Sequence, residues 1–289
     1  MNEITMAPEI LRKIIDFLEE DIGYGDITTH ALIGKTIQAH GEIVCTHAGV
    51  LAGADIAASI FKRRGCSIIS SFTDGQEFLK GSKIMTIDGP AIAILESERV
   101  VLNILSRMSG VATKTKQILE SARKANPKII LAATRKTLPG FRIFDKNAVL
   151  SGGGDPHRLR LDDCVLIKDN HLQLVNSVEE AIQKARSKVS FTKKVEVEVT
   201  TLKQVEDAAG AGADIIMLDN FSPEKVKEAV KMLEDKGLRS RVLIEASGNI
   251  TVNNAAVYAL SGVDVISSGA ITHSAANINM SLGIMKYNS

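Results

Sequence analysis

The densest group of cationic side chains in this sequence lies between Ala133 and His171, among short apolar runs and three consecutive glycines. Its members are Arg135, Lys136, Arg142, His157, Arg158, Lys168 and His171. Guanidinium and ammonium groups bind carboxylate and phosphate oxygens, and each such charge-assisted hydrogen bond contributes roughly 1.5–3 kcal/mol. We therefore expect this stretch to bind a polyanionic ligand.

The composition limits the kind of anion. The chain has 289 residues, 45% of them hydrophobic, and a formal net charge of only +1. The basic group is thus a local feature, and no long Lys/Arg stripe with interleaved aromatic residues indicates nucleic acid as a partner. A small anionic molecule fits better.

The cysteines and the N-terminal segment bear on the compartment. Cys45, Cys66 and Cys164 are widely spaced and match no disulfide framework or metal motif, so we expect buried free thiols. The N-terminal segment is acidic and amphipathic, and no apolar run approaches membrane-spanning length. We expect a cytoplasmic protein without a membrane partner.

From Lys128 onward, aliphatic runs alternate with helical patterns, which is typical of βα units around a parallel sheet. Helix starts are indicated by Ser177 with Glu180, by Thr201 with Gln204, and by Ser222-Pro223. The spacing favours an α/β barrel over a doubly wound sheet without excluding the latter. The expected strands are 129–133, 164–168, 194–199, 214–218, 242–246 and 263–266.

The chain before residue 110 has a different pattern. Turns are expected at Asp74-Gly75, Lys80-Gly81 and Asp88-Gly89, which indicate an antiparallel or mixed α+β unit. A helix over residues 96–124 is predicted to join it to the barrel, with Gly110 as a candidate break.

Polar residues follow the expected parallel strands one after another. Cations follow the first two strands, the carboxylates Glu198 and Asp219 end the next two, and Ser/Gly loops follow the last two. Because the carboxyl ends of parallel strands share one edge, these groups should meet there. We expect cations to hold an anionic substrate, carboxylates to hold Mg²⁺ or sugar hydroxyls, and the late loops to offer amides to a phosphate.

The segments that carry these residues resemble the motifs of the quinolinate phosphoribosyltransferase family, nearly end to end. They are EEDIGYGDITT, ESERVVLNILSRMSGVAT, TRKTLPGFR, GGGDPHR, LIKDNH, EVEV, MLDNF, EASGN and SSGAITHS. The resemblance implies an N-terminal α+β, sandwich-like domain over residues 1–110 and a TIM-like, incomplete α/β barrel over 111–274. The tail 275–289 is expected to pack back on the first domain.

The resemblance also implies an activity. Quinolinate and phosphoribosyl pyrophosphate would give nicotinate mononucleotide, carbon dioxide and pyrophosphate with Mg²⁺, as a glycosyltransferase step of de novo NAD biosynthesis. It implies a homodimer with shared active sites, in which one chain's N-terminal domain covers the partner's barrel mouth, and leaves higher assembly open.

By resemblance, the catalytic residues are Lys136, Lys168, Glu198 and Asp219, and Glu198 and Asp219 face Mg²⁺, directly or through water or substrate. Arg99 would reach the neighbouring chain's site. The substrate-binding residues are Arg99, Thr134, Arg135, Lys136, His157, Arg158, Lys168, Glu198, Asp219, Ser247, Gly248, Asn249, Ser268, Gly269 and Ala270. The sequence departs from the family pattern at Asn249, where a second glycine is common, and at Asp155-Pro156. Asn tolerates left-handed backbone geometry, so the turn at Asn249 is expected to survive.

Some alternatives stay open. Lys168 at a strand end also suits a Schiff-base lyase. A related phosphoribosyltransferase acting on nicotinate or another carboxylate, including the molybdenum-associated paralogue, and a non-catalytic binding barrel are further candidates. Glu196 and Glu198 lie on one strand face, so alternation does not decide which faces the site, although spacing to Asp219 favours Glu198. Asp162-Asp163 precedes a strand and is expected to form a turn.

Overall fold

The computed structural model of the protein describes residues 7–287, which divide into two compact units. The first unit contains the chain up to Thr113, the segment 143–152 and the chain from Ala275 on. The second contains 114–142 and 153–274. The expected division placed 143–152 in the barrel. The structure groups this segment with the first unit, where Phe144 packs on Phe17 and Asp145 pairs with Arg107 at 3.0 Å.

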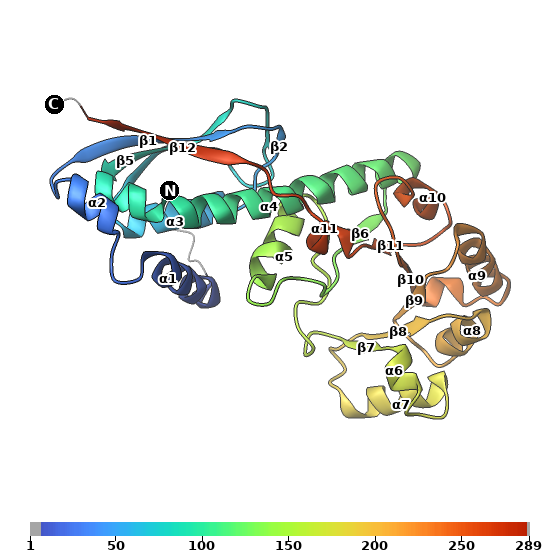
Figure 1. Ribbon diagram of the computed structural model, residues 1–289. Coiled ribbons are helices and arrows are strands. Elements are labelled where there is room, and N and C mark those ends of the chain that lie inside the picture. The colour runs from blue at the N-terminus through green and yellow to red at the C-terminus, as the bar shows by residue number, and fades with distance from the viewer. Residues whose placement is uncertain (1–6, 288–289) are drawn as a thin grey trace. The chain divides into compact units, whose positions relative to one another are not determined.

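The first unit is built on a four-stranded antiparallel sheet in the order β12-β1-β5-β3. Burial alternates along β1, and α3 and the first part of α4 lie along one side of the sheet (Figure 1). The elements of this unit are α1 Pro8–Ile22, α2 Ile27–Leu32, β1 Gln38–Cys45, β2 Gly49–Val50, α3 Ala54–Arg63, β3 Ser67–Ser71, β4 Glu77–Phe78, β5 Lys83–Pro90, α4 Ala91–Ala125 (to Thr113), α5 Arg142–Ser151 and β12 Met280–Lys286.

Two predictions for this unit are wrong, and both concern glycine. Asp88-Gly89 forms no turn but lies inside β5, where a side chain on Gly89 would meet the Cα of Cys66 at 2.8 Å. Gly110 does not break α4, which continues for 35 residues. A Cβ at Gly110 would lie 2.2 Å from the carbonyl oxygen of Ala276. Each glycine permits close backbone approach, which a local pattern does not distinguish from a turn.

The second unit contains a parallel sheet in the order β6-β11-β10-β9-β8-β7. Its strands are β6 Ile130–Ala132, β7 Val165–Ile167, β8 Val195–Val199, β9 Ile215–Asp219, β10 Leu243–Ser247 and β11 Val265–Ser267. The helices α7 Val178–Lys188, α8 Leu202–Gly210 and α9 Pro223–Asp235 lie outside the row of strands (Figure 1). The shorter helices are α6 Asp169–Leu172, the 3-10 turn η1 Arg239–Arg241, α10 Ala255–Ala259 and α11 Ala270–His273.

All six predicted parallel strands are present, each shifted or shortened by a few residues at most. Thr201 and Gln204 form the expected capping box, and Ser222 caps α9 with Pro223 in its first turn. Ser177 caps α7 as expected, but the carboxylate of Glu180 accepts from Asn176 rather than from Ser177. Local signals thus define these helix starts.

The parallel sheet is an incomplete barrel. Asp155 bridges Ala132 in parallel, which extends the sheet beyond β6, and no pairing within residues 7–287 joins this edge to β7. The fold class therefore agrees with the predicted mixed α/β architecture. The three cysteines are free, with Cys45 and Cys66 buried and Cys164 half-buried. Within the described chain, no helix has the length and apolar character needed to cross a membrane.

Candidate active site

The predicted site residues of the second unit gather at the carboxyl edge of the parallel sheet. Thr134, Arg135 and Lys136 follow β6, and Lys168 follows β7. Glu198 lies near the end of β8 and Asp219 ends β9. The small residues of the late loops end or follow the last two strands: Ser247, Gly248 and Asn249 after β10, and Ser268, Gly269 and Ala270 after β11. Parallel pairing places all these strand ends on one side.

Opposite charges meet directly at this edge. Nζ of Lys168 lies 3.3 Å from Oε2 of Glu198, which joins the ends of β7 and β8. Asp219 accepts a hydrogen bond from the side-chain amide of Asn220 at 2.9 Å, which fixes the carboxylate orientation. The acidic and basic groups that the sequence indicates therefore lie on neighbouring strands.

The segment after β6 is fixed against the segment after β11. Thr272 donates to the carbonyl oxygen of Lys136 at 2.7 Å, and the amide of Lys136 donates to the hydroxyl of Thr134 at 3.1 Å. A Cβ on Gly269 would meet Cδ of Lys136 at 2.9 Å, so the lysine side chain crosses this glycine. The buried Nε of Arg135 has no hydrogen-bond partner in the described part of the chain. This donor suits an anionic ligand.

The late loops have well-defined backbone conformations. Asn249 has φ of 49°, so it adopts the left-handed conformation expected of it. Gly248 has φ of 115°, and a Cβ there would meet Oδ1 of Asn220 at 2.3 Å. Ser268 donates to the carbonyl oxygen of Ile250 at 2.6 Å and accepts from the amide of Ala270 at 3.2 Å. These contacts hold the loops in fixed conformations.

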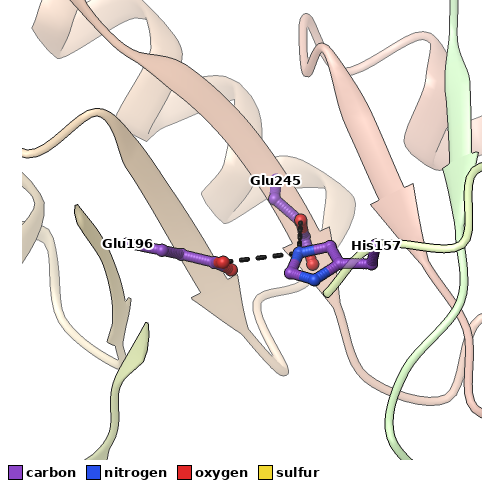
Figure 2. A group of neighbouring side chains, drawn as sticks. All are labelled: His157, Glu196 and Glu245. Atoms are coloured by element: carbon purple, nitrogen blue, oxygen red, sulfur yellow. Dashed lines mark ion pairs between the residues drawn. The ribbon is translucent and has the colours of Figure 1, made fainter. Parts of the chain in front are cut away.

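Below the edge, two glutamates enclose the ring of His157 (Figure 2). Nε2 of His157 lies 3.3 Å from Oε2 of Glu196 on β8 and 3.4 Å from Oε2 of Glu245 on β10. The side chains of Glu196 and Glu245 are 0% and 1% exposed. Both carboxylate oxygens of Glu196 and Oε1 of Glu245 have no hydrogen-bond partner within the described residues. Because His157 belongs to the segment next to β6, the sheet must curve for these contacts to form.

Burial and charge act in opposite directions on this group. Burial lowers the pKa of His157, but hydrogen bonding to Glu196 and Glu245 outweighs it and raises the pKa to about 10. The amide of Arg158 donates to Nδ1 at 2.8 Å, which favours the neutral ring because that nitrogen must then be unprotonated. Nε2 carries a proton in the charged ring and in this neutral form of the ring. Burial raises the pKa of Glu196, and its closeness to Glu245 adds to this effect.

The structure explains the ambiguity between the two glutamates of β8. Glu196 and Glu198 lie on one strand face, but Glu198 is nearer the carboxyl end and pairs with Lys168, whereas Glu196 is buried against His157. The sequence left Glu196 open as the alternative to Glu198 and placed Glu245 among the polar residues at the strand ends, but it predicted no contact of either with His157. The available signal was their register, since each lies two residues before a predicted site residue on the same face.

Other predicted residues lie elsewhere or serve the backbone. Arg99 is exposed on α4 in the first unit, and its role across chains stays a prediction. His171 accepts from the amide of Lys168 at 2.9 Å and caps α6. Asp162-Asp163 forms a turn before β7 as expected, with Asp163 accepting from the amides of Leu159 and Arg160. Lys168 is 45% exposed and ion-paired, unlike the desolvated lysine of a Schiff-base site.

Comparison with known proteins decides the family. A model of the quinolinate phosphoribosyl transferase C-terminal domain matches residues 111–283, and one of the N-terminal domain matches residues 26–109. The chain belongs to the quinolinate phosphoribosyl transferase family. A relative from Methanothermobacter thermautotrophicus, named probable nicotinate-nucleotide pyrophosphorylase (carboxylating), is 46% identical over 96% of this chain and 98% of its own length.

Relatives in the same family come from distant organisms. The human nicotinate-nucleotide pyrophosphorylase (carboxylating) is 36% identical over 96% of this chain and 93% of its own length. The crystal structure of NadC from Streptococcus pyogenes has 36% sequence identity and a TM-score of 0.91, and the match covers 98% of this chain and 99% of that one. The chain therefore has both domains of the family.

Proposed function

We propose that this chain transfers the phosphoribosyl group of phosphoribosyl pyrophosphate to quinolinate and removes one carboxylate, giving nicotinate mononucleotide, pyrophosphate and carbon dioxide. The relatives described above carry the name of this carboxylating enzyme. The structural observation that supports the reaction best is the Lys168–Glu198 pair at 3.3 Å, because it brings a substrate cation and a sugar-facing carboxylate together at one sheet edge.

Quinolinate carries two adjacent carboxylates, and the site offers cations for both. Four cations lie in segments at the carboxyl edge of the sheet: Arg135, Lys136, Arg158 and Lys168. The unpaired, buried Nε of Arg135 would gain a partner when an anion binds. A monocarboxylate such as nicotinate would leave part of this positive charge unmatched, so quinolinate is the better substrate.

The residues also fit the two chemical steps. As the bond to pyrophosphate breaks, positive charge develops at the anomeric carbon, and Glu198 and Asp219 stabilise it. The pyridine nitrogen attacks that carbon. When the bond to the 2-carboxylate breaks, its electron pair stays at C2 until a proton arrives, and the nearby cations stabilise that charge. No covalent enzyme intermediate is required.

Glu198 and Asp219 also fit a magnesium site. They are carboxylates at the ends of adjacent strands, and Mg²⁺ typically binds through one or two carboxylates together with substrate phosphates and water. Bound there, Mg²⁺ would neutralise charge on the leaving pyrophosphate. The donor set alone would complete no tight site, so metal binding should depend on phosphoribosyl pyrophosphate.

We also propose a homodimer with shared sites. The first unit exposes Ile15, Tyr24, Ile27 and Leu32, each more than half exposed, and the second exposes Leu138, Leu161, Leu174 and Phe191. These side chains are available for contact with a partner, and the family resemblance assigns that role to a second copy. The free thiols support the proposed cytoplasmic location.

Pyrophosphate release tests the substrate assignment. Purified protein with Mg²⁺ and phosphoribosyl pyrophosphate is expected to release pyrophosphate with quinolinate and far less with nicotinate. Chelation of the metal should abolish release, and added Mg²⁺ should restore it. Faster release with nicotinate would favour the related monocarboxylate enzyme, and full activity under chelation would contradict the magnesium proposal.

A further inference from the structure

The buried carboxylates of Glu196 and Glu245 have no place in the proposed chemistry, yet their burial needs a reason. Carboxylates are rarely this buried unless an ionic or hydrogen-bonding partner compensates, because desolvation disfavours the charged form. Nε2 of His157 lies within ion-pair distance of both carboxylates. Both oxygens of Glu196 and Oε1 of Glu245 have no hydrogen-bond partner in the described chain. One side-chain nitrogen of His157 and one carboxylate oxygen each of Glu196 and Glu245 lie within 4.8 Å of one another.

The contacts of the other ring nitrogen indicate what holds this cluster together. Nε2 carries a proton in the charged ring, and also in the neutral ring, where the amide of Arg158 donates to Nδ1 at 2.8 Å. A protonated Nε2 donates to carboxylates and does not bind a metal ion. The distances of 3.3 and 3.4 Å place Nε2 within ion-pair range of both carboxylates.

The ring also connects a loop to the sheet interior. On one side, Asp155 is fixed to β6, because its amide donates to Leu131 at 2.8 Å and its carbonyl accepts from Ala133 at 2.9 Å. On the other side, His157 reaches the glutamates of β8 and β10. Arg158 follows directly and bonds the ring through its own amide. Its backbone therefore depends on both anchors.

The backbone at this point requires such support. His157 has φ of 52°, a left-handed conformation that non-glycine residues rarely adopt. The carboxylate of Asp155 accepts from the amide of His157 at 2.6 Å, which stabilises the turn from one side. Without the ring contacts, the segment has a strained residue with one anchor, and Arg158 would be free to move.

We propose that Glu196 and Glu245 are positioning residues for quinolinate binding: they hold the Nε2–H of His157 and so fix the loop that presents Arg158 to the substrate. This inference rests on the proposed function, since it takes Arg158 as a ligand of a quinolinate carboxylate. The two glutamates do not contact substrate themselves. They act through the ring and the loop.

Steady-state kinetics of Glu245→Leu and Glu196→Leu test the proposal. Each removes an acceptor for Nε2 at similar side-chain size, and KM for quinolinate is expected to rise roughly ten- to a hundredfold, the equivalent of one charge-assisted hydrogen bond. KM for phosphoribosyl pyrophosphate should stay near the wild-type value. Glu245→Gln keeps an acceptor oxygen and should restore most of the quinolinate affinity.

A matched control separates positioning from general destabilisation. Asp264 lies before β11, at the opposite end of the same sheet, where it pairs with Arg239 at 2.9 Å and accepts from the amide of Ile244 at 2.8 Å. Asp264→Ala should lower the unfolding temperature without changing KM for quinolinate. Equal rises of both substrates' KM in the glutamate variants, or an unchanged KM for quinolinate, would overturn the proposal.

Nitrogen-15 NMR of histidine-labelled protein gives a reading independent of turnover. The His157 signal is assigned by its loss in His157→Gln, and Nε2 is expected to carry the proton in wild-type protein. A ring with its proton on Nδ1 alone would overturn the proposal. Wild-type protein that does not consume quinolinate would instead contradict the proposed function, so the two failures are distinguishable.

Discussion

Individual residues of this site are defined by which strand end they occupy. Asp214 lies just before β9 and Asp219 ends it, so one strand carries a carboxylate at each edge of the sheet. Asp214 accepts from the amide of Val195 and from Arg186, both at 2.7 Å, whereas Asp219 faces the candidate site. One aspartate, Asp214, thus supports the fold at one edge of the sheet, and the other, Asp219, is placed for the proposed chemistry at the opposite edge.

This pair makes a direct prediction. Asp219→Asn should reduce kcat/KM for phosphoribosyl pyrophosphate by roughly 10²–10³-fold, because it removes charge that stabilises the developing cation. Asp214→Asn should leave kcat/KM unchanged and reduce the free energy of unfolding by about 1–3 kcal/mol. Steady-state kinetics and urea unfolding of both variants measure this. Equal activity losses would contradict the assignment of the two edges.

Asn249 is a second residue whose backbone matters more than its side chain. At φ of 49°, a β-branched residue costs about 1–2 kcal/mol relative to the right-handed conformation, whereas glycine costs nothing. Asn249→Val should therefore raise KM for phosphoribosyl pyrophosphate much more than Asn249→Gly. The same KM in both variants would show that the left-handed turn is not needed for phosphate binding.

Cys45 gives a pH prediction. Burial raises the pKa of its thiol from an ordinary 9.0 to about 12, so the folded state keeps a proton that the unfolded state loses. The stability linked to this proton is fully present below pH 9 and is lost as the pH rises toward 12. The free energy of unfolding of wild-type protein, measured by urea titration, should fall more steeply from pH 8.5 to 10.5 than that of Cys45→Ala, by about 1.4 kcal/mol per pH unit at most. The same pH dependence of the free energy of unfolding in wild-type protein and Cys45→Ala would contradict a raised thiol pKa.

At the scale of elements, the long helix α4 depends on one glycine. Ala at a helix interior is normally better than Gly by about 1 kcal/mol. At Gly110, however, a Cβ would lie 2.2 Å from the carbonyl oxygen of Ala276, in the segment that leads into β12. Local propensity and tertiary contact therefore act in opposite directions here.

We expect the contact to dominate. Gly110→Ala should reduce the free energy of unfolding by about 1–3 kcal/mol, as overpacking does. Gly210 at the end of α8 is the matched control, because a Cβ there meets nothing within 4 Å and Gly210→Ala should be neutral or stabilising. Thermal unfolding of the two variants is the measurement. A stabilised Gly110→Ala would mean that the segment near Ala276 moves away without cost.

Elements differ in how far the sequence predicts them. The parallel strands and the caps at Thr201 and Ser222 are encoded by local apolar runs and polar residues at fixed spacing. The predictions failed at Gly89 and Gly110 because both contact backbone distant in sequence. The contact of Glu196 and Glu245 with His157 was not predicted for a related reason, because His157 lies on a loop that no local pattern places between them.

The whole molecule consists of two units, and the predicted site residues are divided between them. All except Arg99 lie in the second unit, while Arg99 lies in the first. The site could be formed by both units of one chain or by units of two different chains. The two arrangements predict different activities for mixtures of inactive variants. The homodimer proposal requires the second arrangement.

Mixing two inactive variants distinguishes these arrangements. Arg99→Ala and Lys136→Ala chains should each be nearly inactive alone, and hybrid dimers should recover activity because one of their two sites contains both residues. Subunit exchange is verified with differently tagged chains. No recovery, despite demonstrated exchange, would contradict sharing of Arg99 across chains.

The central claim is that this site couples phosphoribosyl transfer to loss of the 2-carboxylate of quinolinate. We would therefore incubate the protein with Mg²⁺, phosphoribosyl pyrophosphate and quinolinate labelled in that carboxylate, and measure labelled carbon dioxide and nicotinate mononucleotide together. The account predicts equal amounts of both products. Label that stays in the pyridine product, or no consumption of quinolinate, would contradict it.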